Sequence, residues 1–530
     1  MSGALKAVSN ATLGFLGLNT QEAGVTLESG YATKAINCII DKSGRLGSRR
    51  GWSFITTNSS TLGTNYLESI FEFIDVDRSS TFISIGNLKL FTGDVTLTEQ
   101  PVKAANQTTN VSLTFTGNRW QICQLAEGAG MGASMYGFLA QNGNPMLVYR
   151  RTSHAGAYIF QQIGDYGTKP TGVTTFDPDC VLSAFGRIWT AGVTGAKSTI
   201  YFSKLLDGSV FTGTGSGLLD VASVIGNNDE IVALASHNGF LVIFCRNNII
   251  IYNNPSDPTS TSFSLQDVIT NVGCIARDSV QATGTDLIFL SKGGLRSLNR
   301  VINEKSAPMR DLSANIRDDL ISYIAGETLT NIKSAYFERD AFYLLMLPGL
   351  KQIIYFDLRQ TLPNGAARPT IWTDMTPKAF CATADRNLYM GMAGGIAKYT
   401  GYSNNGASYR LEYYTQNTDF GLPYSLKFLK KAKVIVIATG SQDMVVKYGF
   451  DYKTNYTSRT YTKDFVGGSS EFNLAEYNIG EYTAGTAIAE IDLNLGGSGK
   501  ILQFGVEATI DGAPVSLQQL TVYIKTGKMV

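Results

Sequence analysis

The side chains that could do acid–base or metal chemistry are few in this sequence, and they are scattered. Histidine occurs only twice in 530 residues, which nearly excludes a zinc site or a histidine-based catalytic site by supply. Carboxylates are paired at Asp75 and Asp77, which bound a turn, and at Asp318 and Asp319, which fall on the polar side of an expected helix. A glycosidase needs two carboxylates at a set separation, which sequence alone does not supply. We therefore expect solvated surface acids and no catalytic centre.

The remaining candidate motifs also favour structural interpretations. The six cysteines include no CxxC pair, and most lie in apolar strand-like runs such as Leu241 to Cys245. This pattern predicts buried, reduced thiols. The glycine-rich stretch Gly213 to Gly217 is followed by neither the lysine nor the helical pattern of a phosphate loop, so it predicts a flexible turn. We expect no cofactor and no bound metal.

Basic residues gather in two short clusters, one near residue 47 and one near residue 430. Each cluster has two interpretations. It is either an exposed strand edge that lysine and arginine protect from aggregation, or a contact with an acidic neighbouring protein. The candidate residues for a subunit or partner interface are Arg45, Arg49, Arg50, Lys427, Lys430, Lys431 and Lys433.

The composition favours a large β protein with little surface charge. Charged residues make up 16% of the chain, against roughly 25% in ordinary soluble domains. The 55 glycines and the many Ser, Thr, Asn, Tyr and Phe residues favour strands and turns over helices. A low charge content suits a protein that hides surface in an assembly, and it also fits a rugged extracellular protein. The net charge of +1 gives no global reason for nucleic-acid affinity.

The stretch Ala35 to Trp52 predicts a β-hairpin near the N-terminus. Ile36, Cys38 and Ile40 form one apolar face at the strand period, and residues 41–44 supply a turn that ends on glycine. We assign residues 1–64 to an N-terminal arm that contains this hairpin.

From residue 65 onward one pattern recurs: an apolar strand, a turn with Gly or Asn, and a second strand that closes on an aromatic residue or Leu. The closing residues lie 44 to 58 positions apart, enough for about four strands in each unit. This period predicts an all-β chain with a β-propeller of six or seven blades over residues 65–404. The closing residues are Phe91, Tyr149, Tyr201, Tyr252, Leu298, Tyr355 and Tyr399.

Two further regions differ from the propeller pattern. Residues 313–326 predict a short helix capped by Ser313 and ended by Gly326, with an apolar face. Residues 405–530 contain long strands with strict alternation, which predicts a separate C-terminal antiparallel β-sandwich domain. The apolar face of the helix consists of Ile316, Leu320, Ile321 and Ile324.

The sequence begins without an apolar run that could act as a signal peptide. Its longest apolar runs are strand-length, too short to span a bilayer, so we expect no membrane segment. The expectation is therefore synthesis in a cytoplasm, with any external location reached as part of a larger assembly.

Four separated patches resemble the tail nozzle proteins (tail tubular protein B type) of short-tailed bacteriophages, the podoviruses. The first is Gly14 to Thr20 with the Arg49 to Trp52 exit of the hairpin. The second joins Asp165 to Gly172 with the run Phe185-Gly186-Arg187-Ile188-Trp189 and the following Tyr201-Phe202-Ser203. The third is Phe420 to Lys427, and the fourth is Gly499 to Gly512 with Ser516 to Gln519.

The resemblance implies a structural virion protein without enzymatic activity or cofactor. It implies a homohexameric ring in the virion tail, made in the bacterial host cytoplasm, that continues the DNA channel below a head-to-tail adaptor ring. Such a ring helps to retain and then release the genome. Its partners would be the adaptor, tail fibre or spike proteins, and viral double-stranded DNA that passes through without tight binding. The alternative is a glycan-binding or glycan-cleaving β-propeller, such as a virion depolymerase or a lectin.

Overall fold

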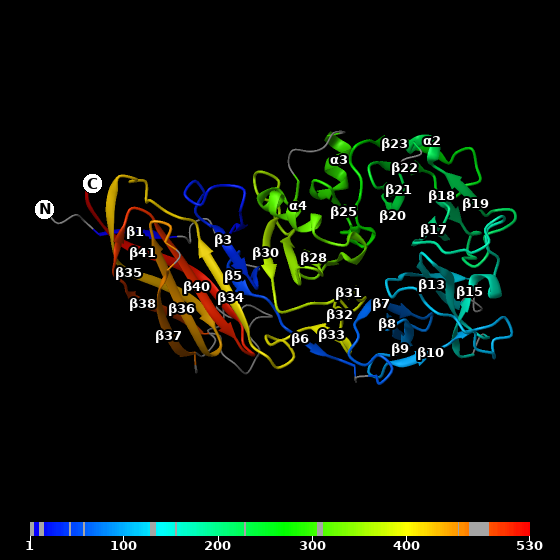
Figure 1. Cartoon of the computed structure of the whole chain (residues 1–530), viewed down its shortest axis with the longest axis horizontal. Helices are drawn as coiled ribbons and strands as arrows, with labels where there is room; N and C mark the ends of the chain where they lie inside the picture. The colour runs from blue at the N-terminus through cyan, green and yellow to red at the C-terminus, as the bar shows by residue number, and fades with distance from the viewer. Residues whose placement is uncertain are drawn as a thin grey trace.

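The computed structural model describes two lobes that lie side by side, a β-propeller and a β-sandwich (Figure 1). Six separate sheets and one end of a ten-stranded sheet form the propeller. The rest of the ten-stranded sheet and a seven-stranded sheet form the sandwich, where strands from both ends of the chain meet. The described residues are 5–9, 15–41, 44–56, 59–127, 134–153, 156–226, 229–304, 311–453, 455–465 and 487–529.

Each blade of the propeller is an antiparallel sheet whose first strand lies nearest the axis. The first blade comprises β7 (Leu67–Ile74), β8 (Ser80–Gly86), β9 (Lys89–Thr92) and β10 (Thr98–Gln100). The second comprises β12 (Gln121–Glu127), β13 (Ser134–Gln141), β14 (Asn144–Arg151) and β15 (Tyr158–Gln162), with β11 (Val102–Lys103) beside β15. The third comprises β16 (Cys180–Ala184), β17 (Arg187–Val193), β18 (Ala196–Phe202) and β19 (Gly217–Asp220), and the fourth comprises β20 (Ile231–His237), β21 (Phe240–Cys245), β22 (Ile249–Asn253) and β23 (Ser264–Ile269).

The last three blades complete the circle. The fifth blade comprises β24 (Gln281–Ala282), β25 (Leu287–Ser291) and β26 (Gly294–Ser297). The sixth comprises β27 (Lys333–Phe337), β28 (Phe342–Leu347), β29 (Gln352–Asp357) and β30 (Arg368–Trp372). The seventh comprises β31 (Ala379–Ala382), β32 (Leu388–Met392), β33 (Gly395–Tyr399) and β6 (Trp52–Phe54). Neighbouring inner strands contact one another around the axis, with the 3₁₀ turn η2 (Arg277–Ser279) bridging β20 to the fifth blade, and β31 returns to β7. The predicted β-propeller therefore has seven blades.

Strand β21 shows why the sequences of inner propeller strands are continuous apolar runs. Leu241, Ile243 and Cys245 pack toward the third blade, whereas Val242 and Phe244 pack toward the fifth. Because both faces of a blade are covered by its neighbours, both sets of side chains are buried and the simple apolar–polar alternation is lost.

The fifth blade departs from the predicted repeat. Leu298, predicted to close a strand, instead begins α3 (Leu298–Glu304), and the blade has three strands among the described residues. Leu298 and Val301 are one helical turn apart and both are buried against the fourth and fifth blades. The chain therefore continues from β26 as a short helix that packs on β25 and β26.

The predicted helix is present but shorter than expected. It consists of η3 (Ala314–Ile316) followed by α4 (Arg317–Ala325), and Ile316, Leu320 and Ile324 are buried as predicted while Ile321 is half-buried. Ser313 does not cap it, because its Oγ donates to Asp311 Oδ1 (3.1 Å) and accepts from the backbone of Leu295 (3.0 Å). The other short helical elements are α1 (Ile163–Tyr166), α2 (Ala222–Ile225) and η4 (Leu329–Asn331).

The seventh blade takes its outer strand from the N-terminal region. Strand β6 pairs with β33 in antiparallel register, with Ser53 opposite Lys398, so the start of the chain closes the ring. The predicted hairpin is confirmed as β4 (Cys38–Ile40) and β5 (Leu46–Ser48), with Cys38 opposite Ser48. The predicted N-terminal arm, residues 1–64, is therefore not a separate part, because its described strands are shared between both lobes.

The sandwich consists of two sheets that enclose one core. One sheet contains β38 (Ala487–Asn494), β35 (Ser425–Ala438), β39 (Ser498–Gly499) and β41 (Val515–Met529), together with β1 (Leu5–Ser9), β4 and β5. The other contains β37 (Thr457–Phe465), β36 (Gly440–Phe450), β40 (Leu502–Ile510), β34 (Tyr409–Thr415), β3 (Tyr31–Ile36) and β2 (Gly17–Leu18).

The predicted C-terminal β-sandwich is therefore present, and its buried faces match the predicted alternation, as in Val506, Ala508, Val522 and Ile524. The sandwich is not separate from the propeller, however. Strand β3 pairs with β34 of the sandwich and, at Ile36 and Ile371, with β30 of the sixth blade, which makes one continuous sheet.

A disulfide across the closing strand pair tests the ring closure. We expect Ser53→Cys combined with Lys398→Cys to oxidise spontaneously, because directly opposed antiparallel residues have the Cα separation that a disulfide needs. The bridge should raise the unfolding free energy by about 2–4 kcal/mol in urea titrations, since it closes a long loop in the unfolded chain. A matched pair that is not opposed, Phe54→Cys with Lys398→Cys, should cross-link far less. Equal cross-linking of both pairs would contradict the register.

Candidate functional site

Arg49, one of the predicted interface residues, lies at the junction of the two lobes and is fully buried (0% exposed). Its Nε donates to Asn37 Oδ1 (2.9 Å) in the arm, and Nη2 donates to the carbonyl of Thr373 (3.0 Å) after β30. Its Nη1 donates to Asn404 Oδ1 (3.1 Å), in the connection from propeller to sandwich, and to the carbonyl of Arg50 (2.9 Å). One guanidinium thus joins three segments that are far apart in sequence.

The charge of Arg49 is compensated without an ion pair in the described part of the chain. Its guanidinium stacks over the ring of Tyr409 in β34 at 4.0 Å from the centroid, and the Tyr409 hydroxyl donates to the carbonyl of Arg49. Within the described part of the chain, no carboxylate lies at ion-pair distance from it. Burial lowers the pKa of Arg49, but an arginine remains charged, so the carbonyl and amide oxygens and the ring face must offset its desolvation.

Two of the predicted interface residues are therefore corrected. Arg49 cannot contact a partner subunit, because protein atoms cover it completely. Lys427 is also buried (1% exposed), and its Nζ donates to the carbonyls of Leu422 and Lys500 (2.6 Å to Lys500). The sequence predicts both residues to be surface cations, because the oxygens that accept their hydrogen bonds belong mostly to segments far away in the sequence.

The other five predicted residues keep some exposure, but most already have acidic neighbours. Arg45 pairs with Asp41 (2.6 Å) across the hairpin turn. Lys431 pairs with Asp492 (2.9 Å) and Lys433 pairs with Glu490, both across β35 and β38. Lys430 is exposed and Arg50 is half-buried. The structure therefore does not bring the seven residues together into one basic surface.

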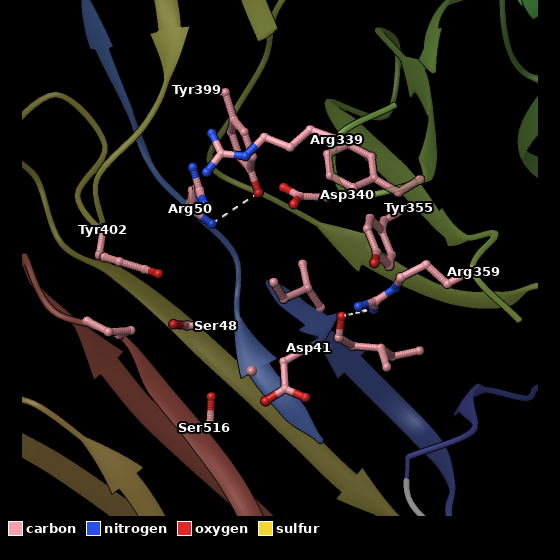
Figure 2. A pocket seen from close by; sticks show the side chains of 15 residues that line it. Asp41, Ser48, Arg50, Arg339, Asp340, Tyr355, Arg359, Tyr399, Tyr402 and Ser516 are labelled. Carbon is pink, nitrogen blue, oxygen red and sulfur yellow. Dashed lines mark hydrogen bonds between the residues drawn. The ribbon is translucent and has the colours of Figure 1, made fainter. Parts of the chain in front are cut away.

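Arg50 lines a small pocket at the junction, with a volume of about 100 Å³ (Figure 2). Its backbone N–H donates to the Tyr399 hydroxyl (3.1 Å). On the opposite side, Arg359 donates from Nε to Asp357 Oδ1 (2.9 Å) and from Nη2 to the carbonyl of Ile40. Figure 2 shows Arg339 and Asp340 on the rim near Tyr399. The pocket lies where the arm, the blades and the sandwich meet, and its polar groups mainly form hydrogen bonds between these parts.

A second charged group, which sequence reasoning missed, lies among the inner strands of four blades and the segments that precede them. The side chain of Arg277, which is 8% exposed, donates to Asp179 Oδ1 (3.0 Å), to Asp278 Oδ1 (2.9 Å) and to the carbonyl of Arg119 (2.9 Å). Lys333 Nζ donates to Asp278 Oδ2 (2.6 Å). Burial alone would raise the pKa of Asp278, but Arg277 and Lys333 hold it well below its usual range. Only the adjacent pair Arg277-Asp278 could have signalled this network in the sequence.

The buried carboxylate of Glu127 was also not predicted from the sequence. Glu127 ends β12, is 8% exposed, and its Oε1 accepts the backbone N–H of Gly208 (2.7 Å) between the second and third blades. Burial raises the pKa of Glu127 to about 8, and the nearby Asp207 acts in the same direction. Because the carboxylate is already held by the backbone N–H of Gly208, we assign Glu127 a structural role between the two blades.

The carboxylates singled out in the sequence have structural roles. The expectation of a solvated acid is wrong for Asp75, which is 6% exposed and pairs with Arg151. Asp77 accepts from the backbone N–H (2.9 Å) and Oγ (2.6 Å) of Ser79 in a tight turn. Asp318 and Asp319 lie in the first turn of α4. Among the described residues, no group of three or more His, Cys, Asp and Glu side chains could hold a metal ion.

The six cysteines are free thiols; four of them are buried as predicted, whereas Cys123 and Cys381 are half-buried. Burial raises the pKa of each, which keeps the thiols protonated and unreactive near neutral pH. Within the part of the chain that the structure describes, no helix is both long and apolar enough to cross a membrane.

Comparisons with known proteins give only distant likenesses. No known family profile matches the sequence, and no curated protein matches it. The solved structure of PorZ, a surface component of the type-IX secretion system of Porphyromonas gingivalis, is 10% identical with a TM-score of 0.35, covering 69% of this chain and 42% of that one. The extracellular domain of BT4673 from B. thetaiotaomicron is 10% identical with a TM-score of 0.26, covering 67% and 40%.

A Polycomb Repressive Complex 2 structure from Chaetomium thermophilum is 8% identical with a TM-score of 0.37, covering 67% of this chain and 97% of that one. The chain spans about two fifths of the length of the first two structures. At these identities and TM-scores, the likenesses say nothing about what the chain does.

Replacing Arg49 tests its role at the junction. We expect Arg49→Gln to lower the unfolding free energy by about 3–5 kcal/mol, because it leaves several buried oxygens without donors. Arg49→Lys should also destabilise, since an ammonium cannot reproduce the planar fork. The neighbouring Arg50→Gln, which removes a half-buried guanidinium, should change stability by no more than about 0.5 kcal/mol. Equal losses for Arg49→Gln and Arg50→Gln in urea unfolding would refute the assignment.

Glu127 gives a testable pH dependence. Its pKa is about 8 in the folded chain against 4.5 in the unfolded chain, so the folded state binds the proton more tightly. The contribution of Glu127 to the unfolding free energy is complete below pH 4.5 and is lost as the pH rises through 8. The unfolding free energy then falls by at most about 1.4 kcal/mol per pH unit. We expect Glu127→Gln to flatten this decline in unfolding measurements between pH 5 and 8. An unchanged slope in the variant would exclude Glu127 as its source.

Proposed function

We propose that this chain is the tail nozzle subunit of a short-tailed bacteriophage, assembling as a homohexameric ring that continues the DNA channel below an adaptor ring. The proposal is carried by one observation: two of the four sequence patches that resemble nozzle proteins coincide with exposed apolar side chains. Leu422 and Tyr424, in the patch 420–427, are 38% and 67% exposed. Leu205 and Leu206 lie beside Gly186 in the patch around 185–189 and are 54% and 51% exposed.

Exposed apolar side chains gathered in this way are typical of protein–protein contact surfaces. The loop before β35 also has a defined shape, because Phe420 and Gly421 adopt positive φ and the buried Lys427 fixes the carbonyl of Leu422. A contact surface that is already ordered loses less conformational entropy on assembly. The low charge content of the chain agrees with a protein whose surface is largely covered by neighbours.

We place the DNA channel of the proposed ring between the subunits, because charged groups lie across the inner ends of the blades. The Arg277 network and the carbonyl of Thr330, which Arg119 contacts, lie across the inner ends of the blades. In the proposed ring, DNA therefore passes between six subunits rather than through any propeller. Head-to-tail contacts between unlike surfaces generate such a closed ring. We place the sandwich lobe toward the adaptor and the propeller toward the distal end.

The second candidate function is glycan binding by a virion depolymerase or lectin. It is favoured by the exposed tyrosines Tyr424 and Tyr452, because aromatic side chains combine a flat apolar face with a polar hydroxyl. Binding of purified protein to host-surface polysaccharide, lost on Tyr452→Ser, would support this candidate. Release of oligosaccharides would be needed for the depolymerase form.

Surface substitutions test the proposed assembly. Leu422→Ser combined with Tyr424→Ser should shift sedimentation from a ring toward monomers by at least tenfold in the midpoint concentration, while the unfolding free energy changes by no more than about 0.5 kcal/mol. Leu350→Ser, at an exposed turn of the sixth blade, is the matched control and should leave assembly unchanged. Rings that persist in the double variant would remove this surface from the assembly.

Duplex DNA binding separates a conduit from a DNA-binding protein. Because each phosphate contact adds salt-dependent affinity, a channel that must release its genome should avoid rows of exposed cations. The chain has 44 basic and 43 acidic residues, so it need not present a basic lumen. In fluorescence anisotropy at physiological salt we expect a dissociation constant no tighter than about 10⁻⁴–10⁻⁶ M. Nanomolar binding by assembled rings, independent of sequence, would overturn the conduit proposal.

A further inference from the structure

The sequence contains four Asn-Gly pairs, and each of them lies in a turn that the structure describes. Asparagine is a thermally labile residue. It loses its amide most readily before glycine, where no side chain hinders the attack of the next backbone nitrogen on the asparagine Cγ. This attack needs a glycine N–H and an asparagine side chain that are not engaged elsewhere. The pairs are Asn142-Gly143, Asn238-Gly239, Asn364-Gly365 and Asn405-Gly406.

Hydrogen bonds hold the pair Asn142-Gly143 in an unreactive arrangement. Asn142 Nδ2 donates to the carbonyl of Gly192 (3.0 Å) and to Thr194 Oγ1 (3.0 Å). The N–H of Gly143 donates to Asp177 Oδ2 (3.1 Å). Attack would require these bonds to open first, so this pair is protected.

The pair Asn364-Gly365 is protected in a similar way. Asn364 Nδ2 donates to Asn315 Oδ1 (2.9 Å), and Asn364 Oδ1 accepts the backbone N–H of Ala366 (3.0 Å). The N–H of Gly365 donates to the carbonyl of Leu362 (2.7 Å). Both the side chain and the glycine nitrogen are therefore engaged.

The pair Asn405-Gly406 lacks this protection. Its two residues have φ of 50° and 88° and form the centre of a tight turn, in which the glycine N–H is not part of the turn's hydrogen bonds. Within the described part of the chain, neither this N–H nor the Asn405 side chain has a hydrogen-bond partner. Both residues are exposed, and open space surrounds Gly406.

The pair Asn238-Gly239 has the same geometry between β20 and β21. Its φ values are 48° and 82°, and both residues are exposed. Asn238 Nδ2 contacts only the ring of His237, at 3.1 Å from Nε2, among the described residues. The structure therefore divides the four pairs into two that are protected and two that are free to react.

Of the two reactive pairs, Asn405-Gly406 lies at the junction of the lobes. The backbone N–H of Asn405 donates to the carbonyl of Trp52 (2.6 Å) in β6, the strand that closes the propeller. The preceding Asn404 accepts Nη1 of Arg49 (3.1 Å). The turn itself is closed by two bonds between Asn404 and Ala407, of 2.7 and 3.0 Å.

From these differences we propose that Asn405 is a site of spontaneous deamidation, and that its main product weakens the junction of the lobes. The nitrogen of Gly406 bonds to Cγ of Asn405 and gives up its proton, the Cγ–Nδ2 bond breaks, and the amide takes up a proton and leaves as ammonia. Water then adds to either carbonyl of the resulting succinimide and opens the ring. No electron is transferred, and the inference does not depend on the nozzle function.

The two products of ring opening have different consequences for the junction. Opening at Cγ gives aspartate, which leaves the main chain unchanged. Opening at the other carbonyl gives isoaspartate, in which the main chain runs through Cβ and Cγ and is longer by a carbon atom. A turn of that length cannot keep both bonds between Asn404 and Ala407 while Asn405 still donates to Trp52.

Peptide mass mapping of the full chain after prolonged incubation at mildly alkaline pH tests the site. We expect conversion at Asn405 and Asn238 to be at least about tenfold faster than at Asn142 and Asn364, because the latter must first break hydrogen bonds. The same chain unfolded in urea is the control, and there the four sites should convert at similar rates. Equal rates at all four sites in the folded chain, or no conversion at Asn405, would overturn the proposal.

Two glycine variants test the effect on the junction. Asn405→Gly keeps a residue that adopts positive φ but removes the amide, and Asn238→Gly does the same at the other reactive turn. On incubation we expect the midpoint of urea unfolding to fall in the unaltered chain and in Asn238→Gly, and to stay constant in Asn405→Gly. An equal fall in Asn405→Gly, or a constant midpoint in the unaltered chain after Asn405 has converted to isoaspartate, would overturn the link to the junction.

Discussion

The arrangement of the two lobes depends on one buried cation, the guanidinium of Arg49. It donates to oxygens of the arm, of the segment after the sixth blade and of the connection into the sandwich, and it stacks on Tyr409. Only arginine offers five donors in one plane together with a flat face for stacking. Because each acceptor belongs to a different segment, the energy of these bonds is realised only when all segments are in place.

The course of the chain reinforces this junction. The arm places β1, β4 and β5 in one sandwich sheet and β2 and β3 in the other, and then continues into β6, which closes the propeller. Asn37 makes the bend between β3 and β4 with φ of 55°, and its side chain receives Arg49. A sheet shared by the sixth blade and the sandwich gives the lobes a common backbone connection. In the proposed ring, this construction lets each subunit behave as one rigid body when DNA passes beside it.

Local patterns in the sequence were sufficient for the class of fold but not for how its parts join. The propeller could be predicted because each blade repeats strands and turns at a regular interval, and the sandwich could be predicted because strands such as β40 alternate strictly. The closing of the seventh blade by β6 could not, since nothing near Ser53 indicates a partner at Lys398. The burial of Arg49 and Lys427 was missed for the same reason: their acceptors are carbonyls and amides of distant segments, which have no signature in the sequence.

Electron microscopy of the purified chain and of its parent particle tests the central claim most directly. The account predicts six-fold rings in which a central channel wide enough for duplex DNA lies between subunits, each propeller axis is closed, and the sandwich lobes form one rim. The same ring should lie at the end of a short tail. Monomers at every concentration together with a particle that lacks such a ring, or a ring whose only openings are the axes of single propellers, would contradict it.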